Sequence, residues 1–234
     1  MRREPPDTAG SPLDPIFDGA TSVPAAFREQ FLYREALPHR VRLDGVLHRV
    51  WHRPRWLAPL FRALGWAGIL VPYAGREIPT TLDVIPSRDA RGRPVHTWAR
   101  TLRFPRRTIR FDTSIVYDAD HGTVADLVGP GNVLYMVWDA RFHPPGTFTL
   151  DSRANAIQLG RLKVWLPRWA WRVLLGTVTF SQRVDAADEH AVHIDLLLTH
   201  PWFGKIFGYD GTFRAVRVEG HAIIGAAPAL FTGD

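Results

Sequence analysis

One segment of the chain, residues 95–104, places a histidine, a tryptophan and an arginine on the same face of a predicted strand. Side chains alternate between the two faces of a strand, so His96, Trp98 and Arg100 point to one side. If that side is the interior, Arg100 is a partly desolvated cation suited to holding a carboxylate, an enolate or a phosphate. The alternative places Arg100 outside, in a cross-strand ion pair worth about 0.5 kcal/mol.

An arginine in an apolar interior needs an acidic partner, because burying an unpaired charge costs several kcal/mol. Two strand carboxylates are candidates, Asp126 and Asp195. We expect Asp195 to be the partner, since it interrupts the otherwise apolar run of residues 194–198.

A second set of residues should complete the interior. By the same alternation, Leu134, Met136, Trp138 and Phe142 form one apolar face, and we expect it to point inward. Tyr209 is predicted near the rim of the interior, because Gly208 and Gly211 bracket it in what we interpret as a turn. The predicted ligand-binding residues are His96, Trp98, Arg100, Met136, Trp138, Phe180, Asp195 and Tyr209.

The remaining reactive side chains form no catalytic motif. There is no cysteine, which excludes disulfides, thiolate catalysis and cysteine-rich metal sites. His48 and His52 fall on one predicted strand face, but no HExxH or three-ligand spacing accompanies them. Ser114 and Ser181 lie in strands without a nucleophile elbow. We therefore predict no metal and no cofactor, while acid–base work by an Asp, His or Tyr in a dry cavity stays open.

The elements that position these residues are mostly strands. Segments with period-two alternation, separated by Gly, Pro and Asp turns, recur between Ile78 and Ile224, and they predict an antiparallel barrel of about ten strands, closed or partly closed. Two short helices, over residues 24–32 and from Pro54 to Gly65, should cap it. The predicted strands are 40–51, 78–85, 95–104, 107–117, 123–128, 133–142, a short 147–150, 156–166, 177–184, 191–199 and 212–224.

Length and composition favour a single domain. A chain of 234 residues with 46% hydrophobic content can bury one sizeable core. We expect a flexible arm over residues 1–22, the barrel over 23–225 and a tail over 226–234. The start of the chain has no apolar run, and the apolar stretch 57–71 is too short to span a bilayer, so the cytoplasm is the default location.

Charge and tryptophan content bear on possible partners. The net charge of +6 comes from dispersed arginines without a reading module, so we expect no nucleic-acid partner. Three of the nine tryptophans crowd into residues 165–171. They are interpreted as core packing plus a lid over the barrel mouth, or as an interfacial patch, joined by residues 51–56, that makes weak contact with a membrane surface.

Four motifs follow one another along the chain: Trp98-Ala-Arg100-Thr-Leu-Arg-Phe104, Val128-Gly129-Pro130, Leu162-Lys-Val-Trp-Leu166-Pro167 and Thr199-His200-Pro201-Trp-Phe-Gly204 with Tyr209-Asp-Gly211. In this order they resemble a bacterial family of domains of unknown function, numbered 4166, over residues 37–213. Asp126 stands where that resemblance leads us to expect a glutamate. The resemblance implies proteins that stand alone or are attached to larger enzymes, and it implies no activity.

Three functions fit these observations. The leading hypothesis is a barrel whose interior binds a mainly apolar small molecule, oriented by Arg100 or another polar group. An isomerase, cyclase or decarboxylase without a cofactor would use the same cavity to position a substrate and move one proton. An accessory domain that docks on a partner enzyme would instead expose a large apolar patch.

Overall fold

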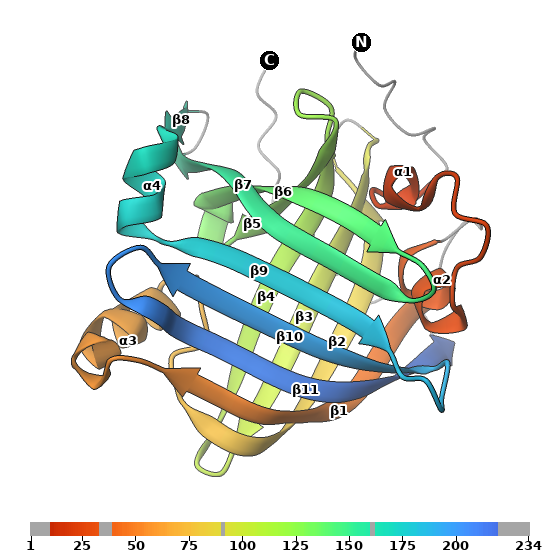
Figure 1. The fold of residues 1–234 in the computed structure, drawn as a ribbon, viewed down its shortest axis with the longest axis horizontal. Helices are drawn as coiled ribbons and strands as arrows, with labels where there is room; N and C mark the ends of the chain where they lie inside the picture. Colours follow the sequence, from red (N-terminus) through yellow and green to blue (C-terminus); the bar gives the residue numbers. More distant parts are fainter. Residues whose placement is uncertain (1–9, 33–38, 90–91, 160–161, 220–234) are drawn as a thin grey trace.

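The computed structural model describes residues 10–32, 39–89, 92–159 and 162–219, which form a closed antiparallel β-barrel (Figure 1). The strands are β1 (His39–His52), β2 (Gly75–Arg88), β3 (Pro94–Phe104), β4 (Arg107–Asp118), β5 (Thr123–Val128), β6 (Leu134–His143), β7 (Thr147–Leu159), β8 (Leu162–Leu166), β9 (Thr177–Val184), β10 (Ala191–His200) and β11 (Gly204–Glu219). The helices are α1 (Asp14–Phe17), α2 (Ala25–Phe31), α3 (Ala58–Trp66) and α4 (Arg168–Leu174), with single 3-10 turns η1 (Arg55–Leu57) and η2 (Pro130–Asn132).

The strands follow one another around the barrel almost in chain order. They pair in the order β6-β5-β4-β3-β2-β1-β11-β10-β9-β7-β8, and β6 also pairs with β7, which closes a ring of ten strands. The predicted fold class is therefore confirmed. None of the helices in the described part of the chain is long and apolar enough to cross a bilayer.

The barrel wall has one seam, along β7, where one edge of the strand has two different partners. The prediction of two separate strands over 147–150 and 156–166 is wrong, because β7 stays paired with β6 along its length, with one bulge between Val137 and Trp138. The start of β7 pairs with β9, and its end pairs with β8. Where β9 and β7 separate, the Ser152 hydroxyl accepts a hydrogen bond from the Val178 N–H at 2.8 Å. The ring closes without β8.

Two other sequence interpretations need correction. A shift of register in β1 between Leu47 and Arg49 turns His48 to the outside, so His48 and His52 do not share a face. Gly208 and Gly211 lie inside β11 and form no turn. They permit close packing, since a Cβ at Gly211 would lie 2.4 Å from the carbonyl oxygen of Val46. The last strand begins at Gly204, and residues 220–224 lie outside the described part of the chain.

One end of the barrel, which we call the closed end, is filled by α1 and α2 (Figure 1). Phe17 of α1 and Phe27 of α2 are buried and contact Phe142 of β6 and Phe148 of β7, with ring centroids 5.1–6.5 Å apart. Such edge-to-face and stacked pairs exclude water and add to the burial energy. The expectation of a flexible arm therefore does not extend to Leu13 and Phe17.

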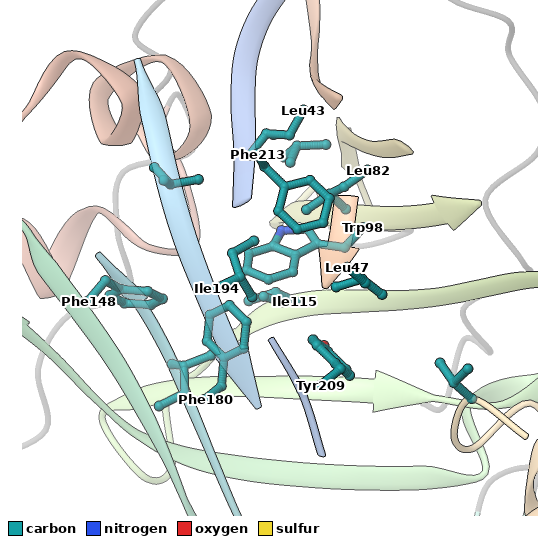
Figure 2. Close-up of a cluster of buried hydrophobic side chains, with 14 of the residues drawn as sticks. Leu43, Leu47, Leu82, Trp98, Ile115, Phe148, Phe180, Ile194, Tyr209 and Phe213 are labelled. Atoms are coloured by element: carbon teal, nitrogen blue, oxygen red, sulfur yellow. The ribbon is translucent and has the colours of Figure 1, made fainter. Parts of the chain in front are cut away.

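The middle of the barrel is packed with leucine, isoleucine and aromatic side chains that come from strands all around it (Figure 2). Trp98 of β3 lies at its centre, 6.0 Å from Phe31 of α2 on one side and 5.9 Å from Phe180 of β9 on another. Trp98 thus separates the closed end from the other end of the barrel, where α3 and α4 lie.

Candidate functional site

A cavity of about 140 Å³ lies inside the barrel beneath α3 and α4. Leu60 of α3 and Leu174 of α4 both line this cavity, although they are 50% and 66% exposed, so they form its rim. Phe61 and Trp171 from the same two helices lie deeper and are buried. We call this end of the barrel, with its two helices, the open end.

Local contacts explain why the helices cover this end. His52, at the end of β1, stacks on Phe61 of α3 at 4.7 Å, and its Nε2 donates to the Val71 carbonyl at 3.0 Å. Helix α4 stops at Gly176, which has a φ of +83° and donates its N–H to the Trp171 and Arg172 carbonyls. Glycine adopts this left-handed conformation without strain and ends many helices in this way.

Polar side chains meet on one wall of the cavity, across the consecutive strands β3, β4 and β5. Arg100 donates from its guanidinium to the Thr113 hydroxyl at 3.3 Å. Thr113 in turn donates to the carboxylate of Asp126. A chain of three polar residues therefore crosses the wall, and all three line the cavity.

The pKa of the Asp126 carboxyl lies near neutral pH. Burial raises its pKa to about 7, against the opposing effects of Arg100 and of hydrogen bonds from Thr113 and the Leu127 N–H. Burial disfavours the charged form of an acid, and a nearby cation or donor favours it. A carboxyl with such a pKa is close to half protonated at pH 7, so it can both donate and accept.

Unpaired polar atoms concentrate at this cavity. Among the described residues, five buried side-chain atoms without a hydrogen-bond partner belong to residues that line it. They are the indole N–H groups of Trp98, Trp138 and Trp171, and one oxygen each of Asp126 and Asn155. Buried polar groups are nearly always hydrogen-bonded in proteins, so this concentration indicates a place where a bound molecule or water supplies partners.

Six of the eight predicted ligand-binding residues line this one cavity: Trp98, Arg100, Met136, Trp138, Phe180 and Tyr209. The Arg100 guanidinium lies over the rings of Trp98 and Phe111, 5.3 and 5.2 Å from their centroids. Tyr209 is buried in β11, and burial raises the pKa of its hydroxyl.

The other two predicted residues lie elsewhere. Ile194 is buried, whereas Asp195 is exposed on the outer face of β10, opposite Asp210 of β11. The expected pairing of Arg100 with Asp195 is therefore wrong, and the carboxylate near Arg100 is that of Asp126. His96 is buried nearer the start of β3 and is not part of the cavity wall, and burial lowers its pKa to about 3.

Three residues that bring a polar group to the cavity wall were not predicted from the sequence. Asn155 pairs across strands with Met136, which pairs with Asp126, so the polar wall extends to β7. Asn155 gave no signal, because it falls in the gap between two predicted strands. Thr113 had a signal, since its place opposite Trp98 follows from the β3–β4 hairpin. Trp171 was noticed only as one member of a tryptophan-rich segment.

Comparison with known proteins assigns the chain to a family but gives no activity for it. A family model described as a domain of unknown function (DUF4166) matches residues 23–213. This match confirms the resemblance found from the sequence motifs. No curated protein matches the chain.

Proposed function

Because the chain belongs to the DUF4166 family, whose name states no activity, we propose a function from the site itself: the barrel binds a small, mainly apolar molecule that carries an oxygen function. The cavity beneath α3 and α4 carries this proposal. Its wall is mainly apolar, with a few polar groups that converge on one side, as in most small-molecule sites.

The size of the cavity limits the ligand. At about 140 Å³ it is smaller than the common range of roughly 300–1,000 Å³ for ligand pockets. An apolar cavity of about 150 Å³ accepts a benzene-sized molecule. A single ring or a short chain therefore fits the cavity, and a longer ligand would extend past Leu60 and Leu174 at the rim.

The polar wall selects the functional group. Arg100 and the indole N–H groups of Trp98 and Trp138 are hydrogen-bond donors of residues that line the cavity, while Asp126 balances the charge of Arg100. A neutral hydroxyl or carbonyl group fits this balance better than a carboxylate, because it brings no uncompensated charge into an apolar interior.

Three eight-carbon probes test this function: octane, 1-octanol and 2-octanone, titrated by calorimetry. We expect saturable binding of the alcohol and the ketone, and weaker binding of the alkane. Met136→Trp should abolish binding by filling the cavity, whereas Val216→Trp, at a position that is 46% exposed on β11, should bind as the wild type does. Equal titrations of Met136→Trp and wild type, or no saturation with any probe, would reject the proposal.

The Asp126 carboxyl favours a second candidate function, proton transfer without a cofactor. General acid–base catalysis works best when the pKa of the catalytic group lies near the working pH. In a bound ketone whose oxygen accepts from Arg100, the Asp126 carboxylate would take a proton from the carbon beside the carbonyl and return it. This is the half-reaction that isomerases of carbonyl compounds share.

Deuterium exchange separates catalysis from binding. With 2-octanone in D₂O, we expect the protein to accelerate exchange beside the carbonyl, followed by NMR, with a rate that rises through about pH 7 as Asp126 ionises. Asp126→Asn should lose this acceleration, and the exposed Asp112→Asn should keep it. Exchange at the buffer rate by a protein that binds the ketone would leave binding as the function.

A further inference from the structure

The exposed tryptophans gather at the open end of the barrel. Trp56 lies in η1, Trp66 in α3, Trp169 in α4 and Trp202 in the turn between β10 and β11, and these elements lie at the same end of the barrel (Figure 1). All four side chains are at least 62% exposed. We call these four residues the tryptophan rim. Soluble surfaces rarely expose several large aromatic side chains together unless they bind something.

Three segments at the same end carry positive charge only. Residues 49–66, 167–175 and 200–205 contain seven Lys and Arg residues and no Asp or Glu, although the chain has 23 acidic residues. Four of the seven line a groove beside the rim, together with Trp51 and Phe203: they are Arg49, Arg53, Arg55 and Lys205. Among the described residues no carboxylate lines this groove, so its charge is available to an anionic partner.

Aliphatic side chains distinguish the possible anionic partners. Leu60 and Leu174 are exposed in the same two helices as Trp66 and Trp169, at the mouth of an apolar cavity. A bound nucleic acid would stack on aromatic rings and pair with cations, but exposed leucines would add nothing to its binding. Tryptophan, leucine and arginine together match the boundary of a lipid bilayer, where indole rings lie at headgroup level and cations meet anionic lipids.

We propose that the tryptophan rim docks on the surface of an anionic lipid bilayer, with the cavity mouth facing the acyl chains. The rim rests on the bilayer as a peripheral contact, with Arg55 and Lys205 against the headgroups. This goes beyond ligand binding in the interior, because it names the surface from which an apolar molecule would reach the cavity between Leu60 and Leu174.

Sedimentation with lipid vesicles tests the docking. We expect the protein to bind vesicles of phosphatidylcholine with phosphatidylglycerol, and to bind phosphatidylcholine vesicles at least about tenfold more weakly. The double variant Arg55→Glu/Lys205→Glu should lose at least about tenfold in affinity for the anionic vesicles. Its matched control is Arg28→Glu/Arg183→Glu, which makes the same change of charge on exposed residues of α2 and β9 and should bind normally.

A second variant tests the aromatic part. Trp66→Ala/Trp169→Ala removes two exposed rings, so it should fold with wild-type circular dichroism while losing vesicle binding and the blue shift of tryptophan emission on anionic vesicles. Equal binding of both lipid compositions, or equal loss in the α2/β9 control, would overturn the proposal. So would retention on single-stranded DNA that is tighter than vesicle binding and is lost in Arg55→Glu/Lys205→Glu.

The interior is tested separately from the rim. Calorimetry with 1-octanol in lipid-free buffer should give the wild-type result for both rim variants, because neither changes a residue of the cavity wall. If vesicle binding fails while octanol binding holds, only the docking is rejected. If octanol binding fails while vesicle binding holds, only the proposed ligand function is rejected.

Discussion

The two ends of the barrel use aromatic residues in opposite ways. At the closed end, five phenylalanines from α1, α2, β6 and β7 pack on one another. At the open end, tryptophans point outward around a cavity whose wall holds Arg100 and Asp126. Phenylalanine has no polar atom and suits a dry plug, whereas the indole N–H suits a boundary with one wet side. One end therefore contributes stability, and the other is available for binding.

The contrast predicts that truncation of an aromatic side chain has very different effects at the two ends. Phe27→Ala, at the fully buried closed end, should lower the free energy of unfolding by about 3–5 kcal/mol. Trp66→Ala, 81% exposed at the open end, should change it by less than about 0.5 kcal/mol. Urea unfolding of the two variants measures the difference. Similar losses would mean that the open end is part of the packed core.

The raised pKa of Asp126 at the open end should make the folded protein less stable as the pH rises. Its folded pKa of about 7 is above its usual 3.8, so the folded state holds a proton that the unfolded state releases, and stability falls as pH rises between these values. Relative to wild type, Asp126→Asn should gain about 2–3 kcal/mol on going from pH 5 to pH 8. Asp112→Asn, on an exposed side chain, serves as the control in the same urea titrations. Parallel pH profiles for all three proteins would contradict the raised pKa.

His96 should act in the opposite sense, nearer the start of β3. Its folded pKa of about 3 is below its usual 6.5, so acid protonates the unfolded state first and stability is lost as pH falls below about 6.5. From pH 7 to pH 5 the loss from this residue is about 2 kcal/mol. His96→Gln should remove that part of the acid dependence. An unchanged acid limb in this variant would show that another group controls it.

The smallest expected effect on stability comes from comparing two glycines, of which Gly176 ends α4. Gly176 and Gly92 both have positive φ, but a Cβ at Gly176 would lie 2.6 Å from the Thr199 carbonyl oxygen, while a Cβ at Gly92 would meet nothing within 4 Å. Gly176→Ala should therefore cost about 1 kcal/mol more than Gly92→Ala. Thermal melts of both variants measure this, and equal costs would indicate that α4 shifts freely.

Much of the fold and part of the site follow from the sequence, because period two fixes what a strand buries. The alternation placed Trp98 and Arg100 inward correctly, and the same rule turns Asp195 outward, since Ile194 is buried beside it. Asp126 could have been preferred for a second reason. In a barrel that follows chain order, β5 lies two strands from β3, whereas β10 lies across the interior.

What the sequence could not supply depends on distant contacts. The single course of β7 depends on its pairing with β6 across polar residues that interrupt the apolar pattern. The exposure of Trp169 and the burial of Trp171, two positions apart in α4, depend on which side of that short helix meets the barrel. Composition marks such a segment as unusual, but only tertiary structure divides its rings between the cavity wall and the rim.

The seam along β7 has a consequence for how this barrel could be altered. Since β7 and β9 pair directly, residues 162–176, with β8 and α4, form an excursion between two wall strands that the closure of the ring does not require. A graft of different length or sequence at this position would keep all ten wall strands. The excursion is thus a replaceable module, and an engineer could change the depth and lid of the cavity there without redesigning the wall.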